Sequence, residues 1–120
     1  MGVRAVRGAI QVDRDDREEI VAATSELLTS VMAGNELTQA ELISIFFTLT
    51  PDLTSCFPAS AARDLGLTDV PLLCATEIDV PDALPRVIRL LAHVELDRPR
   101  STVRHVYLRG ATRLRPDLAA

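Results

Sequence analysis

Three arginines in largely apolar stretches are the first candidates for chemistry in this sequence. Arg7, Arg89 and Arg115 have mostly small or aliphatic neighbours and no carboxylate immediately beside them. A guanidinium group does not lose its charge, so each head group must reach water or meet an anion in the fold. For one arginine, the ordinary explanation is that the stem packs on the core while the head reaches solvent. Three together favour a pocket for a small molecule with several negative charges.

Two acidic residues offer a second kind of chemistry. Glu77 and Asp79 are two positions apart and would form a carboxylate pair of the glycosidase kind if they shared one strand face. Pro81 follows closely, however, and favours a cap or turn role for Asp79. The glycosidase pair is therefore the weaker interpretation.

Cys74, His93 and His105 are the remaining candidates for nucleophilic or acid-base catalysis. No histidine lies near Cys74 in the sequence, and a lone cysteine is usually a small buried hydrophobe. The two histidines are more often structural residues than catalysts. Cys74 and Glu77 are three residues apart, so a regular strand directs them to opposite faces. Both can line one pocket only if the strand bends or ends between them.

The composition describes one globular domain, residues 1–120. Hydrophobic residues make up 48% of the chain, charged residues 25% and aromatic residues 3%. The formal net charge of -4 and the few aromatic rings argue against nucleic-acid binding. A chain of this length buries roughly 65% of its unfolded surface. That core is modest, and association with further copies would enlarge it.

The cysteines and the amino terminus predict a cytoplasmic protein. Cys56 and Cys74 are far apart, belong to no CxxC pattern and have no nearby histidine to complete a zinc site, so reduced thiols and no metal are expected. Arg4 and Arg7 interrupt the apolar start of the chain. Neither a signal peptide nor a transmembrane helix is therefore expected.

Hydrophobic periodicity and turn residues predict the elements that position these side chains. Strands are expected at 3–12, 42–50, 71–77, 86–96 and 103–108, and an irregular tail at 110–118. A main helix is expected between the polar cluster 13–16 and Gly34, with a shorter one from Pro58 to Gly66. A capping box at 38–41 indicates a short turn. The order β-α-β-α-β-β-β predicts an α/β (α+β) fold, a mixed sheet with helices on one side.

Several short segments recur together in one order and carry a family resemblance. They are Val6-Arg7-Gly8-Ala9, Thr50-Pro51-Asp52-Leu53, Phe57-Pro58-Ala59, Val70-Pro71 with Cys74 and Glu77, Ile88-Arg89, Arg104 to Leu108, and Leu114 to Leu118. Together they closely resemble the monofunctional chorismate mutases of the AroH class, over almost the whole chain. The resemblance implies an isomerase of aromatic amino-acid biosynthesis that converts chorismate to prephenate without cofactor or metal. It also implies a homotrimer, a trimeric pseudo-α/β-barrel with active sites at the subunit interfaces.

The resemblance also implies roles for particular residues. Arg7 is similar to the family's carboxylate-binding arginine, and Arg89 to the cation that bonds the ether oxygen and a carboxylate of chorismate. Glu77 resembles the acceptor of the substrate hydroxyl, with Cys74 its neighbour near the same ring region. Tyr107 resembles a tyrosine that meets a carboxylate, and Leu114 and Arg115 match tail residues that close the site. The stretch offered by the adjacent subunit corresponds to Phe57, Ala59, Ser60 and Arg63.

Two positions depart from the family pattern. Some members have a lysine at the Ser60 position and a threonine at the Leu73 position. Ser60 removes a cation and Leu73 removes a hydroxyl near the substrate, so neither residue takes over the role of its counterpart.

The alternative from another functional class is a non-catalytic trimeric module that binds an anionic metabolite with the same arginines. Such a module needs Arg7 and Arg115 for carboxylates. It has no reason for a cation over the middle of the ligand, where Arg89 is expected. The position of Arg89 therefore discriminates between the two functions.

Overall fold

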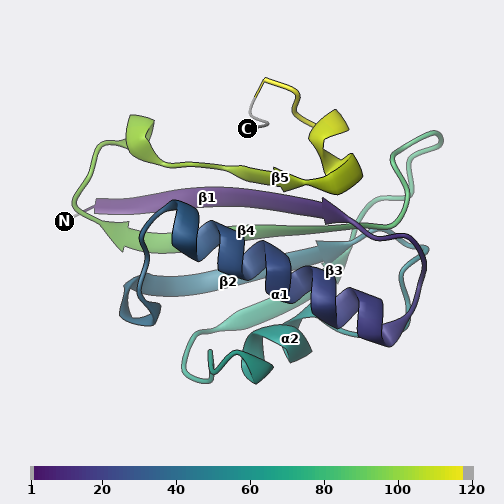
Figure 1. The fold of residues 1–120 in the computed structure, drawn as a ribbon, viewed down its shortest axis with the longest axis horizontal. Coiled ribbons are helices and arrows are strands. Elements are labelled where there is room, and N and C mark those ends of the chain that lie inside the picture. Colours follow the sequence, from purple (N-terminus) through teal and green to yellow (C-terminus); the bar gives the residue numbers. More distant parts are fainter. Residues whose placement is uncertain (1, 118–120) are drawn as a thin grey trace.

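The alternating and apolar segments of the sequence form one five-stranded sheet in the computed structural model, which describes residues 2–117 (Figure 1). The strands are β1 (Gly2–Gln11), β2 (Leu42–Leu49), β3 (Leu72–Thr76), β4 (Val87–Leu96) and β5 (Val106–Leu108). The helices are α1 (Arg17–Gly34) and α2 (Pro58–Asp64), and the 3₁₀ turns are η1 (Gln39–Glu41), η2 (Arg100–Thr102) and η3 (Arg109–Arg113). The predicted element order is confirmed. Leu118, the end of the expected tail, lies outside the described residues.

The strand order is β3-β2-β4-β1-β5, and β4 lies at the centre. It pairs antiparallel with both β1 and β2, whereas the outer pairs β1–β5 and β2–β3 are parallel. The prediction of a mixed sheet is confirmed. Central placement gives β4 a neighbour on each edge, so residues of β4 have partners from two strands.

Both helices cover the same face of the sheet and enclose the main core with it (Figure 1). The Asp16 carboxylate caps α1 by accepting a hydrogen bond from the Glu18 N–H at 2.9 Å. Gly8 of β1 permits close packing, because a Cβ there would lie 3.1 Å from Leu27 Cδ1 of α1. In the described part of the chain, neither helix is both long and apolar enough to cross a membrane.

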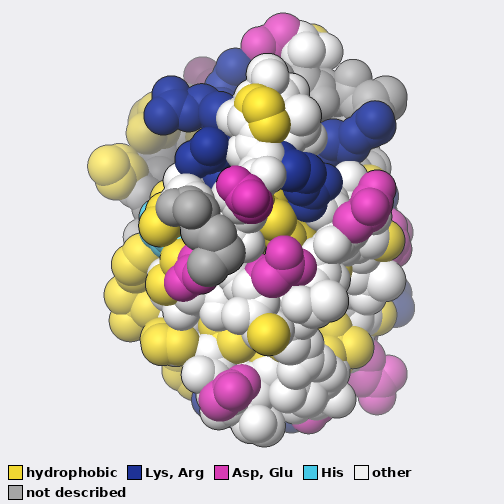
Figure 2. Space-filling view, turned by 90° about the vertical axis from the view of Figure 1, so that its left-hand side faces the viewer, with side chains coloured by type: hydrophobic (Ala, Val, Ile, Leu, Met, Phe, Trp, Pro, Cys, Tyr) yellow, Lys and Arg dark blue, Asp and Glu magenta, His cyan; other side chains and the backbone are white. Residues whose placement is uncertain are grey.

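The opposite face of the sheet is bare and largely apolar; we call it the bare face. Val3, Phe46 and Leu73 lie on it with 61%, 42% and 57% of their surfaces exposed. Figure 2 shows hydrophobic side chains gathered along the left flank, on the side of the sheet away from α1, with arginines in the upper half. A contiguous apolar surface of this kind marks a binding or assembly surface.

The last strand is shorter than the sequence predicts. It begins at Val106 and not near Val103, because the buried Asn35 side chain takes both backbone groups of Arg104. Asn35 Oδ1 accepts from the Arg104 N–H at 2.7 Å, and Asn35 Nδ2 donates to the Arg104 carbonyl at 2.9 Å. The backbone of this segment is therefore held by the end of α1 and not by the sheet.

Candidate active site

A row of side chains crosses all five strands on the bare face. Arg89 of β4 lies opposite Thr48 of β2 on one side and Ala9 of β1 on the other. Ala9 in turn pairs with Tyr107 of β5, and Thr48 pairs with Ala75 of β3. Directly opposed residues of neighbouring strands point to the same face. Arg89 therefore stands in the middle of the sheet.

A second row runs beside the first and contains Arg7. Leu73, Phe46, Leu91 and Arg7 are paired in turn across β3, β2, β4 and β1. Arg7 is thus a diagonal neighbour of Arg89. A depression of about 330 Å³ lies between the rows, and Arg7, Phe46, Thr48, Arg89 and Leu91 are among the residues that line it. Within residues 2–117 the Arg7 guanidinium has no carboxylate partner, so its charge is available to an anion.

Arg89 has a carboxylate partner that its sequence neighbours do not reveal. Its Nε lies 3.1 Å from Oε2 of Glu77, and the Thr48 hydroxyl donates to the same oxygen at 2.5 Å. The Glu77 side chain is only 17% exposed, against 47% for that of Arg89. Glu77, itself bound by Thr48, therefore holds the guanidinium through Nε, and among the described residues no hydrogen bond or ion pair engages its two Nη groups.

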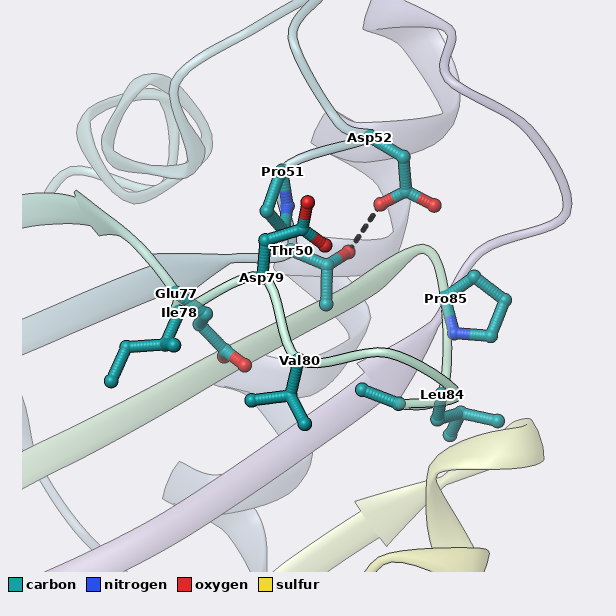
Figure 3. A pocket seen from close by; sticks show the side chains of 10 residues that line it. Thr50, Pro51, Asp52, Glu77, Ile78, Asp79, Val80, Leu84 and Pro85 are labelled. Atoms are coloured by element: carbon teal, nitrogen blue, oxygen red, sulfur yellow. Dashed lines mark hydrogen bonds between the residues drawn. The ribbon is translucent and has the colours of Figure 1, made fainter.

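Glu77 also lines a smaller cavity of about 150 Å³ formed by the loop between β3 and β4 (Figure 3). The Thr50 hydroxyl donates to Asp52 at 2.5 Å there, and the Asp52 carboxylate accepts from the Arg86 N–H. Asp79 lies in the same loop and outside the strands, two residues before the turn at Pro81. This network fixes the loop that starts at Glu77.

The carboxyl-terminal segment brings three more predicted residues to the bare face. Tyr107 is buried in a small cluster with Ala9 and Val87, and Leu114 packs against it. Arg115 makes a two-pronged ion pair with Asp117, at 3.1 and 2.9 Å. The hydrogen bonds and the charge of Arg115 lower the pKa of the Asp117 carboxyl, although partial desolvation opposes them. An anionic ligand would have to compete with Asp117 for Arg115.

Cys74 is not brought to the arginines. It is paired with Phe47 and packs with the main core, on the helix-covered face. The parity argument is therefore confirmed, because β3 ends at Thr76 and the Glu77 side chain reaches the bare face while Cys74 does not. Leu73, where the family pattern departs, is the residue of this segment that lies in the row with Arg7.

The α2 residues also lie apart from the arginines within one chain. Phe57 is 69% exposed and Arg63 is exposed, whereas Ala59 is buried in the same chain. Phe57 lines a hollow together with Cys56 and with Thr76, the last residue of β3. These side chains therefore do not complete the site of their own chain.

Thr48 belongs to this candidate site, and the sequence did not reveal it. Its hydroxyl binds Glu77, and its partner across the sheet is Arg89. The available signal was the alternation of the strand, which places Thr48 on the same face as Phe46. Only the pairing of β2 with β4 shows that this face is also the face of Arg89.

Comparison with known proteins identifies the family of this chain. The chorismate mutase type I family matches residues 3–118. Chorismate mutase AroH of Thermus thermophilus is 55% identical over 117 residues, which cover 97% of this chain and 96% of that protein. Chorismate mutase AroH of Bacillus subtilis (strain 168) is 40% identical over 120 residues, with 99% and 94% covered. A solved chorismate mutase from Clostridium thermocellum superposes with a TM-score of 0.89 at 45% identity, covering 90% of this chain and 96% of that one. The chain belongs to the chorismate mutase type I family.

Proposed function

We propose that this chorismate mutase isomerises chorismate to prephenate on the bare face, with Arg89 as the principal catalytic cation. The observation that carries the proposal is the position of Arg89. It stands at the centre of the sheet, is held through Nε by Glu77, and lies diagonal to Arg7. Two cations in diagonal positions on one face suit a compact ligand with two carboxylates.

The reaction needs orientation and electrostatics and no proton transfer. A carbon–oxygen bond of chorismate breaks while a carbon–carbon bond forms through a compact chair, and negative charge grows on the ether oxygen. The enzyme must hold the folded conformer and place a positive charge at that oxygen. Arg89 meets this need, because Glu77 and Thr48 fix its head group before the substrate arrives.

The other residues of the site bind different groups of the substrate. Arg7 binds a carboxylate, and Glu77 accepts a hydrogen bond from the substrate hydroxyl with the carboxylate oxygen that Thr48 and Arg89 leave free. Tyr107, Leu114 and Arg115 close the site from the carboxyl-terminal side. No step uses a metal or a cofactor.

We propose that the working enzyme is a homotrimer with shared sites. The bare face carries Val3, Phe46 and Leu73 exposed, which favours burial against further copies. Phe57 and Arg63 are exposed at the α2 edge, away from the arginines of their own chain, and would complete a neighbour's site. We also place the enzyme in the cytoplasm, because both of its cysteines are free thiols.

Incubation with chorismate tests the function directly. We expect the ultraviolet absorbance of chorismate to fall as prephenate forms. Binding of chorismate without turnover, measured by calorimetry, would instead support the non-catalytic module.

The rate is expected to stay nearly flat from mildly acid to mildly alkaline pH, because guanidinium groups do not titrate there. No solvent deuterium effect on the chemical step is expected. Activity lost at lower pH would reflect protonation of the substrate carboxylates or of groups that position the arginines. A bell-shaped profile centred near neutrality, or a substantial deuterium effect, would indicate general acid-base catalysis and contradict the proposal.

Thr48→Val is expected to lower kcat/KM about tenfold, because Glu77 loses one of the two groups that hold it. Hydrogen bonds to charged groups contribute about 1.5–3 kcal/mol, and the remaining bond to Arg89 retains part of the order. Steady-state kinetics measure the effect, with Thr48→Ser as the matched control that keeps the hydroxyl. Equal loss in the Ser and Val variants would assign the effect to packing and not to the hydrogen bond.

A further inference from the structure

The imidazole of His105 takes the place of a backbone acceptor beside Arg7. Strand β5 pairs with β1 only from Val106 onward, opposite Gly8. One residue earlier the ladder is continued by a side chain, because the Arg7 N–H donates to Nδ1 of His105 at 3.0 Å. The backbone that carries the carboxylate-binding arginine is therefore held by a group that can titrate.

This hydrogen bond requires the neutral imidazole. Nδ1 accepts the hydrogen bond from the Arg7 N–H only through its lone pair, so the ring hydrogen must be on Nε2. Protonation of the ring turns Nδ1 into a donor that faces the donor N–H of Arg7. The bond is then lost, and the end of the β1–β5 ladder has no acceptor at this position.

The surroundings of His105 favour the neutral form of the ring. Arg7 of β1 and Arg115 of the carboxyl-terminal segment both act on it, and Asp117 is occupied by Arg115. A hollow of about 380 Å³ next to the ring is also lined by Arg4, His93 and Arg100. Partial burial, followed by the charges of Arg7 and Arg115, lowers the pKa of His105 from its ordinary value.

We propose that His105 is a positioning residue whose neutral imidazole fixes Arg7 for carboxylate binding and sets an acid limit to substrate affinity. The inference rests on the proposed function, since Arg7 is taken as a substrate ligand. It requires no proton transfer from His105 to the substrate. The flat rate near neutrality is retained, because the ring stays neutral there and becomes charged only in more acid solution.

Kinetics of two substitutions test this role. Asn places Oδ1 where His has Nδ1, so His105→Asn keeps an acceptor that does not titrate, whereas His105→Ala removes it. We expect His105→Ala to raise KM roughly three- to tenfold at neutral pH with a smaller change in kcat. His105→Asn should keep a neutral-pH KM close to that of the wild type. It should also lose the increase in KM at acid pH that protonation of His105 causes. An unchanged KM in His105→Ala, or an acid rise that persists in full in His105→Asn, would overturn the proposal.

His93→Asn is the matched control, since His93 faces the same hollow but its Nδ1 lies 3.2 Å from the Ser44 hydroxyl and not from Arg7. Its acid profile should equal that of the wild type. Loss of the acid rise in KM in His93→Asn would assign that rise to His93 and overturn the proposal for His105.

Nuclear magnetic resonance tests the same link without any activity. The His105 ring should titrate below its ordinary pKa of 6.5, and the Arg7 amide shift should follow with the same midpoint. In His105→Asn that step of the Arg7 amide should vanish. A His105 titration that leaves the Arg7 amide unmoved would overturn the inference. Failure of the wild type to convert chorismate would instead remove the proposed function and leave this coupling measurable.

Discussion

Replacement of Arg89 by alanine is expected to lower kcat at least 10²–10³-fold. Loss of one preorganised donor at a developing oxyanion costs about 2.7–4 kcal/mol, and Arg89 is the only arginine in the central row of the described sheet. Arg89→Lys keeps the charge but loses the planar head group that Glu77 holds through Nε, so a large loss is expected there too. Single-turnover measurements with chorismate report the chemical step.

Two controls bear on this result. Arg14→Ala removes a cation from an exposed position in the loop between β1 and α1 and should leave kcat unchanged. Arg7→Ala should impair turnover with a share of its effect on KM, since Arg7 binds a carboxylate. Near-normal turnover in Arg89→Ala would mean that the catalytic cation lies elsewhere.

Two inactive variants, Arg89→Ala and Arg63→Glu, are expected to regain about a quarter of wild-type activity when co-expressed in equal amounts. In a trimer with shared sites, each site takes Arg89 from one chain and Arg63 from the next. Random mixing then gives about one site in four with both residues intact. Distinct affinity tags isolate the mixed species, and light scattering should give about three times the chain mass of 13.1 kDa.

The matched control pairs Arg89→Ala with Arg7→Ala. Both residues lie on the bare face of the same chain, so every site in the mixture lacks either Arg7 or Arg89. No recovery of activity is therefore expected. An active monomer, or recovery in neither mixture, would contradict the shared-site arrangement.

The elements could be predicted because their signals are local. Asp16 at the start of α1, Pro58 at the start of α2 and the alternation around Arg7 and Arg89 each depend on a few neighbours in sequence. The length of β5 could not be predicted in this way. It depends on Asn35, which is 69 residues from Arg104 and takes that residue's backbone groups by tertiary contact.

The site could be predicted only in part, for the same reason. The arginines stood out by their neighbours, but Glu77 as a partner of Arg89 depends on the end of β3 meeting β2 and β4. Strand order is not encoded in periodicity, so neither Thr48 nor the ladder position of His105 was found. Family resemblance supplied roles for Phe57, Ala59 and Arg63, which one isolated chain does not bring to the arginines.

The row of side chains that crosses the five strands depends on the pairing register of β4. Arg89 faces the bare side only because β4 is in step with both neighbours, and a shift by one residue would exchange it for Ile88 or Leu90 from the core. A single-residue deletion within β4 would therefore invert the site and the core together. A change of loop length leaves the register of β4 intact, whereas a change in the number of residues along this central strand does not.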